Sequence, residues 1–264
     1  MENRLIALTT DFGHQDPFVG IMKGVILGIN PDARIVDVTH GIAPQDIRGG
    51  ALALHYAAPY FPPGTIHVAV IDPGVGTERR PILIECEDAF FVGPDNGVLS
   101  LAAERRKKRR VVELADERYR LNPVSATFHG RDIFAPSAAH LSLGVPPEDF
   151  GRALKEYTRL TWPAPIKGDG EARGEIIYID HFGNLITNIT ERDLEPLGGR
   201  NVEIALVDVT ICGLASSYAG AETGGYAALI NSWGLLEISC YNARADQRSG
   251  AGIGDPVHAR SAAR

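Results

Sequence analysis

The chain has 264 residues, which is enough for one large domain or for two domains of ordinary size. Hydrophobic residues make up 44% and charged residues 22%, proportions that are ordinary for a soluble globular protein. The formal net charge of −7 argues against a general nucleic-acid-binding protein, because phosphate groups attract a basic surface.

Through about residue 155 the hydrophobic pattern alternates between strands and helices. Helices are predicted where apolar residues recur every three or four positions, at 17–29, 46–60, 97–104 and 132–143. Strands are predicted where apolar and β-branched residues follow one another, at 4–10, 33–39, 68–71, 82–86, 89–93 and 111–114. A short turn separates 82–86 from 89–93, which indicates a hairpin. This alternation predicts an α/β N-terminal domain over residues 1–160, with a mostly parallel sheet sandwiched by helices.

A linker and a second domain follow. Residues 161–170 are rich in proline, glycine and polar side chains and show no periodicity, so they are expected to be a linker. Beyond them, short strands are separated by turn residues without a convincing helix between them, at 174–180, 185–190, 201–207, 226–231, 235–240 and 256–260. This pattern predicts a smaller antiparallel, β-barrel-like C-terminal domain over 171–264.

Several features concern partners and the cellular compartment. The basic run ERRKKRR at 104–110 is interpreted as a solvated helix end rather than an RNA-binding patch, because cations favour the C-terminal end of the helix dipole. Cys86, Cys212 and Cys240 have neither zinc-site nor disulfide spacing, which predicts reduced core thiols. The N-terminus lacks a signal-peptide pattern, and no apolar run reaches the roughly 18 residues that a membrane span needs. We therefore expect a soluble cytoplasmic protein with no nucleic-acid or membrane partner.

Candidate functional residues follow the predicted strands, where an open parallel sheet binds its ligands. Asp11 follows the first strand, Asp72 follows 68–71, and His129 and Asp132 stand at the entry to the helix at 132–143. Glycines in DPGVG (72–76) allow the backbone to approach a ligand closely. Arg79, seven residues after Asp72, can fold back to form a carboxylate–guanidinium pair whose spare donors could hold a water or an anion.

Structural interpretations compete with these functional ones. Asp11 and Asp132 could cap the helices that follow them, and a lone histidine such as His129 is more often a hydrogen-bonded core residue. The DFG at 11–13 lacks the rest of a kinase signature. The GVG at 74–76 matches neither a dinucleotide fingerprint nor a P-loop. No GxSxG elbow is present, which argues against a serine hydrolase of the usual type.

Six motifs together carry a family resemblance: TTDFG (9–13), IDPGVGTERRP (71–81), GPDNGVLS (93–100), TFHGRDIFAP (127–136), DHFGNLITNI (180–189) and NSWGLLEIS (231–239). They resemble the S-adenosyl-L-methionine hydroxide adenosyltransferases, which are relatives of the bacterial fluorinase and chlorinase. The likeness runs from residue 5 to about 260 and implies the two-domain fold predicted above. It also implies a homotrimer whose substrate lies between the N-terminal domain of one subunit and the C-terminal domain of the next.

Residue roles are implied by the same resemblance. Asp72, Arg79 and His129 match the set that positions and activates water. Asp11 matches the carboxylate that binds both ribose hydroxyls, while Phe128 and Gly130 match residues lining the ribose and nucleophile pocket. The remaining matches lie in the second domain. Asp180 and Asn184 match residues that bind the amino acid end of methionine, and the backbone at Asn242 and Ala243 matches the part that contacts adenine. Ser232 matches a contact to the methionine carboxylate, and its neighbour Trp233 replaces an arginine of the fluorinase.

The expected activity is hydrolysis of S-adenosyl-L-methionine to adenosine and L-methionine, without a metal or other cofactor. The fluorinase carries Tyr where Asp72 stands and Tyr-Ser where His129-Gly130 stand. A buried carboxylate about 4 Å from a halide would repel it by roughly 4 kcal/mol at an effective dielectric of about 20. A halide-using adenosyltransferase and a non-catalytic S-adenosylmethionine or nucleoside sensor are the alternatives. A methyltransferase is disfavoured, because the glycine-rich loop after the first strand is absent.

Overall fold

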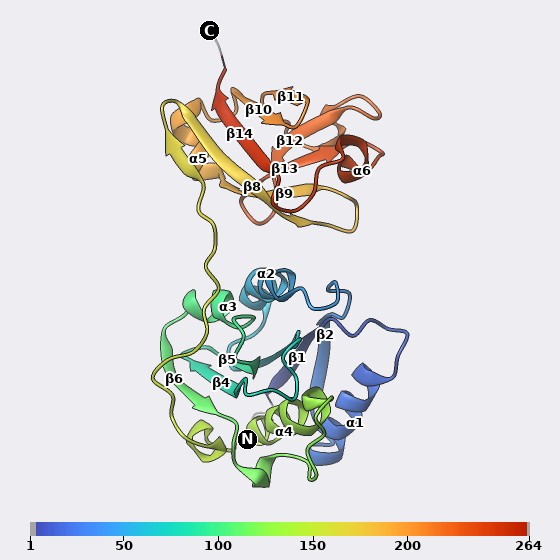
Figure 1. The fold of residues 1–264 in the computed structure, drawn as a ribbon, viewed down its shortest axis with the longest axis vertical. Coiled ribbons are helices and arrows are strands. Elements are labelled where there is room, and N and C mark those ends of the chain that lie inside the picture. Colours follow the sequence, from blue (N-terminus) through green and yellow to red (C-terminus); the bar gives the residue numbers. More distant parts are fainter. Residues whose placement is uncertain (1–3, 263–264) are drawn as a thin grey trace. The chain divides into compact units, whose positions relative to one another are not determined.

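The computed structural model describes residues 4–262 and divides into two compact units, with the boundary between Leu160 and Thr161 (Figure 1). We call them the N-terminal unit and the C-terminal unit and describe each by itself. The expected fold class is confirmed: the first unit is α/β with a mostly parallel sheet, and the second is an antiparallel, barrel-like sheet. Among the described residues, no helix is both long enough and apolar enough to cross a membrane.

Six strands form the sheet of the N-terminal unit, in the order β2-β1-β3-β5-β4-β6. Their bounds are Leu5–Thr10 (β1), Arg34–Thr39 (β2), Thr65–Val70 (β3), Pro81–Cys86 (β4), Ala89–Pro94 (β5) and Lys108–Glu113 (β6). Strands β2, β1, β3 and β5 run parallel, whereas β4 is antiparallel to both of its neighbours and forms the expected hairpin with β5. Strand β3 is buried along its whole length, as a central strand covered on both faces must be.

Helices cover both faces of this sheet (Figure 1). They are α1 (Phe18–Ile29), α2 (Ile47–Ala57), α3 (Ser100–Glu104) and α4 (Ala135–Ser142). Apolar residues of α1 and α4, such as Met22 and Leu141, pack in one core with β1 and β3. Those of α2 and α3, such as Leu54 and Ala102, pack in a second core on the other face. The two cores explain why the strands read as continuous apolar runs rather than as alternating ones.

The strand order places a crevice at the centre of the sheet. The chain leaves β1 through α1 to reach β2 on one side, and it leaves β3 toward β4 and β5 on the other side. Adjacent β1 and β3 therefore send their connections in opposite directions beyond their carboxyl ends. Open α/β sheets bind ligands at such a point. Asp11 and Asp72 follow these two strands.

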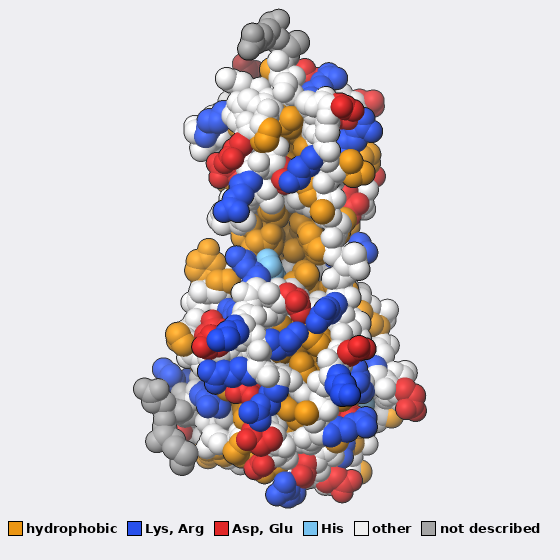
Figure 2. Space-filling view, turned by 90° about the vertical axis from the view of Figure 1, so that its left-hand side faces the viewer, with side chains coloured by type: hydrophobic (Ala, Val, Ile, Leu, Met, Phe, Trp, Pro, Cys, Tyr) orange, Lys and Arg blue, Asp and Glu red, His pale blue; other side chains and the backbone are white. Residues whose placement is uncertain are grey.

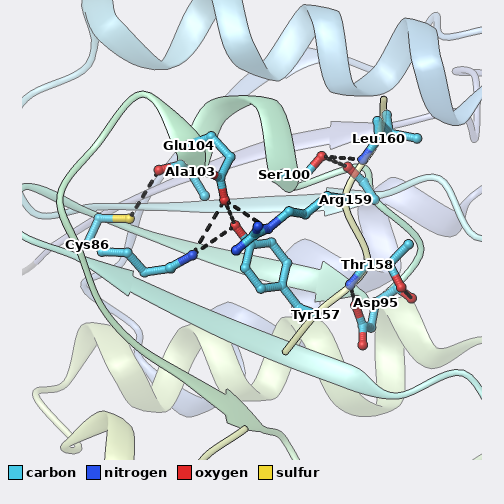
Figure 3. Close-up of polar contacts among 11 residues, drawn as sticks. Cys86, Asp95, Ser100, Ala103, Glu104, Tyr157, Thr158, Arg159 and Leu160 are labelled. Atoms are coloured by element: carbon cyan, nitrogen blue, oxygen red, sulfur yellow. Dashed lines mark hydrogen bonds and ion pairs between the residues drawn. The ribbon is translucent and has the colours of Figure 1, made fainter. Parts of the chain in front are cut away.

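The last residues of the N-terminal unit are fastened to its surface (Figure 3). Thr158 donates from its backbone N–H to Asp95 Oδ1 at 2.6 Å and from its hydroxyl to the Asp95 carbonyl at 3.1 Å. The Leu160 N–H donates to Ser100 Oγ at 3.1 Å, and the Tyr157 hydroxyl donates to Glu104. These contacts hold the chain up to the residue at which the unit ends.

The C-terminal unit is an eight-stranded antiparallel sheet. Its strands are Ile166–Gly168 (β7), Glu171–Ile179 (β8), Leu185–Thr190 (β9), Val202–Leu206 (β10), Val209–Cys212 (β11), Tyr226–Ile230 (β12), Leu235–Cys240 (β13) and Pro256–Ser261 (β14). Seven follow the order β11-β10-β14-β8-β9-β13-β12, and β7 pairs with β8. A bridge between Leu214, just after β11, and Ala228 on β12 joins the two ends and nearly closes a barrel. One apolar core fills its interior.

Some local expectations are wrong in detail. Strand β7 lies inside the segment expected to be a linker, and the short helices α5 (Glu191–Leu194) and α6 (Ala245–Ser249) lie between strands where no helix was expected. Only Glu104 of the basic run ends a helix. Residues 108–110 begin β6, where Arg110 pairs with Glu85 and Glu148. Cationic and acidic side chains lie intermixed on the face of the N-terminal unit that Figure 2 shows.

The cysteine expectation also needs a correction. All three cysteines are free, but only Cys86 and Cys240 are buried. Cys212 is exposed because it lies at the end of β11, an edge strand of the barrel, with its side chain facing away from the core.

Candidate active site

The site in the N-terminal unit is assembled from four segments at the carboxyl end of the central strands. Asp11 directly follows β1, Asp72 lies two residues after β3, and Arg79 lies two residues before β4. His129 immediately precedes a π-helical turn, Gly130–Phe134, that leads into α4. Residues from far-apart stretches of the sequence thus meet at the crevice of the sheet.

The loop from Asp72 to Arg79 folds through two successive turns. The Val75 N–H donates to the Asp72 carbonyl at 3.2 Å and the Thr77 N–H donates to the Gly74 carbonyl at 3.2 Å. Gly76 has a φ of +76°, and a Cβ there would lie 2.3 Å from the Ala126 carbonyl oxygen. Only glycine fits both conditions, so the loop packs closely against the segment that precedes His129.

Arg79 joins Asp72 and His129 in one hydrogen-bonded set. Its Nε donates to Asp72 Oδ1 at 2.8 Å, and its Nη2 donates both to Asp72 Oδ2 and to His129 Nδ1, the latter at 2.7 Å. The ion pair is well buried, with side-chain exposures of 5% for Asp72 and 9% for Arg79. Arg79 Nη1 is also buried and has no hydrogen-bond partner within the described protein. A spare guanidinium donor is what the sequence led us to expect from this pair.

The contact with Arg79 fixes the protonation pattern of His129. A guanidinium can only donate, so Nδ1 must accept and the ring hydrogen of the neutral imidazole lies on Nε2. Burial lowers the pKa of His129, and the neighbouring Arg79 charge lowers it further. The imidazole is therefore neutral near pH 7, and Nε2 offers an N–H rather than a lone pair.

A cleft of about 380 Å³ adjoins this set. Asp11, Asp72, Phe128, His129 and Gly130 line it, so five of the six residues predicted for this domain meet there. The sixth, Arg79, is not among the lining residues but is bonded to two of them. Asp11 does not cap the helix that follows, because α1 begins after Pro17 without a side-chain cap. Its Oδ2 instead accepts from the Gln45 N–H at 2.7 Å, a bond that holds the carboxylate at the cleft.

Three aromatic rings form one wall of the cleft. Phe12, Phe18 and Phe128 pack edge-on or tilted, with centroids 5.2–5.8 Å apart. A Cβ added at Gly130 would meet Phe128, Met22 and Phe12 at 3.1–3.4 Å, so this position leaves little room for a side chain. The prediction did not include Phe12 or Phe18. Phe12 lies within the TTDFG motif, which was the available signal for it, whereas Phe18 belongs to the apolar stripe that predicted the helix and gave no separate signal.

Asp132 has a structural position. It is buried, its Oδ2 accepts from the Ser125 N–H at 2.7 Å, and its Oδ1 accepts from Arg131 at 2.5 Å. These bonds hold the loop before His129 rather than capping the helix that follows. No group of three or more His, Cys, Asp or Glu residues within 4–262 is arranged to hold a metal ion.

A second cavity, of about 560 Å³, lies in the C-terminal unit. Four predicted residues line it, namely Asp180, Asn184, Asn242 and Ala243. Asp180 accepts from three donors at 2.9 Å: the N–H groups of Phe182 and Asn184 and the side-chain amide of Asn184. Phe182, Tyr218, Tyr241 and Arg244 also line the cavity and were not predicted. Phe182 lies within the DHFGN motif, which was the available signal for it.

Ser232 and Trp233 lie elsewhere on this unit. They belong to the turn between β12 and β13 and are not among the residues that line the cavity. The Trp233 N–H donates to Asn231 Oδ1 at 2.9 Å, and the indole lies against Tyr178 with centroids 5.6 Å apart. The structure thus groups Asp180 with Asn242 but leaves Ser232 and Trp233 outside that cavity wall.

Comparisons with known proteins agree with this architecture. The family model described as the SAM hydroxide adenosyltransferase N-terminal domain matches residues 6–151, and the model of its C-terminal domain matches residues 174–258. The chain is 45% identical over 196 residues to a protein of Salinispora tropica named (R)-S-adenosyl-L-methionine hydrolase, covering 73% of this chain and 74% of that one. A protein of the same name from Methanocaldococcus jannaschii is 39% identical over 246 residues, covering 89% and 88%.

More distant relatives and a solved structure are also similar to this chain. Fluorinases are similar at 28–30% identity over most of the chain. The crystal structure of an uncharacterized conserved protein from Thermotoga maritima is similar with a TM-score of 0.91 and 35% identity. That likeness covers 97% of this chain and the whole of the other.

Proposed function

Because this chain belongs to the SAM hydroxide adenosyltransferase family, we propose that it hydrolyses S-adenosyl-L-methionine to adenosine and L-methionine. The observation that carries the proposal is the buried Asp72–Arg79–His129 set at the wall of the N-terminal cleft. Three groups with hydrogen-bonding capacity converge there. We propose that the reaction needs neither a metal nor another cofactor, because the sulfonium already supplies a neutral leaving group.

The reaction is an in-line displacement at the ribose 5′-carbon. A bond forms between the water oxygen and C5′ while the C5′–S bond breaks, and its electron pair goes to sulfur. Methionine leaves as a neutral thioether, so no acid is needed to protonate it, and the water proton is released to solvent. Since an anionic nucleophile and a cationic sulfonium cancel their charges, the aromatic wall of Phe12, Phe18 and Phe128 favours the step by excluding water.

The hydrogen-bonding pattern narrows the role of each side chain. Asp72 holds Arg79 through two bonds, and Arg79 holds His129 through Nδ1. With its ring hydrogen on Nε2, His129 can donate to the nucleophilic oxygen but cannot take a proton at that atom. We infer that the Nε2 N–H of His129 positions the water and stabilises hydroxide as it forms, and that Arg79 acts through His129, because its spare Nη1 is buried and Arg79 does not line the cleft.

Water is favoured over halide as the nucleophile. Asp72 places a carboxylate at the cleft wall, where a halide would be repelled as it enters, whereas water enters as a neutral molecule and becomes anionic only as it loses its proton. The relatives named as hydrolases are 36–45% identical to this chain, whereas the fluorinases are 28–30% identical. The halide-using alternative would be supported by a halogenated nucleoside formed in the presence of chloride.

We assign the remaining predicted residues as contacts to the other parts of the substrate. Asp11 would bind the ribose hydroxyls beside Phe128 and Gly130, and Asp180 with Asn184 would bind the methionine amino group. Ser232 beside Trp233 would contact the carboxylate, and the backbone at Asn242 and Ala243 would contact adenine. These residues belong to two different units, and we propose a homotrimer in which neighbouring subunits share each site. A cytoplasmic location fits the use of S-adenosylmethionine as the substrate.

The test is incubation with S-adenosyl-L-methionine followed by chromatography of the products. We expect adenosine and methionine in equal amounts from the wild type and little from Asp72→Ala and His129→Ala. His258→Ala is the matched control, since His258 lies on β14 and lines neither cavity. A wild type that binds the substrate without releasing adenosine would be a sensor, and full turnover by both site variants would refute the assignment of the set.

A further inference from the structure

Glu237 is a deeply buried carboxyl that the proposed reaction does not use. It lies in the middle of β13, opposite Leu229 of β12 and Ile186 of β9, and is 2% exposed. None of the described Lys, Arg or His side chains lies within ion-pair distance of it, in contrast to the buried Asp193, which pairs with Lys167. Burial raises the pKa of Glu237, as expected for an acid without a counter-ion.

Two neutral donors are bonded to this carboxyl. One is the Tyr218 hydroxyl and the other is the side-chain amide of Asn231, while Glu237 Oε1 is buried and has no partner among residues 4–262. The cost of burying the acid is therefore only partly offset. An apolar side chain of the same size would fill the space, but it would leave the hydroxyl and the amide without an acceptor.

Tyr218 connects Glu237 to the cavity of the C-terminal unit. Tyr218 lines this cavity together with Asp180 and Asn184, and its hydroxyl is hydrogen-bonded to the Glu237 carboxyl. Burial, together with the bond to Glu237, raises the pKa of Tyr218 to about 12, so the hydroxyl remains a donor at all ordinary pH values. The bond to Glu237 therefore sets where the tyrosine ring stands.

Asn231 connects Glu237 to the turn that carries Ser232 and Trp233. Its Oδ1 accepts from the Trp233 N–H at 2.9 Å and from the Leu235 N–H at 3.1 Å. Because the oxygen is used in this way, the amide nitrogen is the end that faces Glu237. One carboxyl thus holds both the cavity wall and the turn between β12 and β13.

We propose that Glu237 is a positioning residue for the methionine end of the substrate, acting through its hydrogen bonds to Tyr218 and Asn231. The inference rests on the proposed function, which assigns Asp180 and Ser232 to that end. Glu237 touches no reacting atom in this scheme. Its loss impairs binding of the substrate more than the chemical step.

Four variants test this, with initial rates of adenosine formation, calorimetric binding of S-adenosyl-L-methionine and melting temperature as measurements. Glu237→Ala and Tyr218→Phe are each expected to raise KM about tenfold while kcat stays within about threefold. The double variant is expected to be no worse than the poorer single one, because both remove the same bond. Glu237→Gln is expected to stay close to the wild type, since its amide oxygen can accept both bonds. Glu203→Ala is the control, because Glu203 pairs with Arg260 on β10 and β14 and lines neither cavity.

The outcomes separate this inference from the proposed function. An unchanged KM in a folded Glu237→Ala variant overturns the inference and leaves the hydrolase assignment intact. If Glu237→Ala does not fold, an unchanged KM in Tyr218→Phe overturns the inference in the same way. Equal losses in Glu237→Gln and Glu237→Ala would show that the charge matters and not the hydrogen bonds, which also overturns it. If the wild type binds the substrate without turnover, the proposed function fails and the dissociation constants of the same variants decide the inference. A wild type that binds no substrate refutes both.

Discussion

Replacing Asp72 by asparagine removes the charge of the buried set with almost no change in shape. Asp72 accepts two bonds from Arg79, whose side chain is 9% exposed and whose Nη1 already has no partner in the described part of the chain. In the variant, the amide oxygen can accept one of these bonds, but the amide N–H₂ meets a guanidinium N–H, donor against donor. The guanidinium charge then stays buried without a counter-ion.

The cost of this change can be estimated in two steps. Removing one partner of a buried ion pair costs about 3–5 kcal/mol. For a domain of this size each kcal/mol lowers the melting temperature by roughly 2–4 °C, which gives a fall of about 6–20 °C. Because the set no longer holds the water, we expect adenosine formation to fall by at least about 10²-fold.

Calorimetric melting and product chromatography measure the two effects side by side. Glu203→Gln is the control, since it disrupts an ion pair whose arginine partner is 60% exposed and should cost no more than about 1 kcal/mol. A second variant, Asp72→Asn with Arg79→Met, should recover much of the stability but none of the activity. If Asp72→Asn melts with the wild type and also forms adenosine at the wild-type rate, the reasoning about this set is wrong.

Three further predictions concern other groups. Turnover should fall on acidification below pH 6.5. Burial and Arg79 lower the pKa of His129, and a protonated ring can no longer accept a hydrogen bond from Arg79. A pH profile of kcat/KM with its midpoint above 6.5 would contradict this. Burial lowers the pKa of His67 to about 3, so near pH 5 this imidazole is protonated in the unfolded chain and neutral in the folded chain. Between pH 7 and pH 5 the wild type should therefore lose about 2 kcal/mol more unfolding free energy than His67→Phe, as measured by urea unfolding. Equal losses in the two proteins would show that His67 does not cause the pH dependence. Asp180→Ala releases three donors at the C-terminal cavity and should raise KM by about tenfold or more with kcat nearly unchanged, whereas a fall in kcat alone would place Asp180 at the chemical step.

Local patterns were sufficient for much of the fold. The apolar runs at β1 and β3 and the helical period of α1 depend on residues close together in the chain, so they could be read directly from it. The basic run at 104–110 shows the limit of such patterns. Its helix ends at Glu104 because residues from Lys108 pair with β4, a partner about twenty residues away that no local period reveals.

The sequence by itself determined which chemical groups stand after which strands, and hence that Asp11 and Asp72 lie at the crevice of the sheet. It also indicated that Arg79 can pair with Asp72, but it did not determine that the same guanidinium bonds to His129, fifty residues farther along the chain. The ring hydrogen of His129, the aromatic wall and the burial of Glu237 were likewise decided only by the tertiary structure. The physical reason is that protonation and hydrogen bonding depend on which distant groups exclude water around a side chain, whereas strand and helix periods depend on near neighbours.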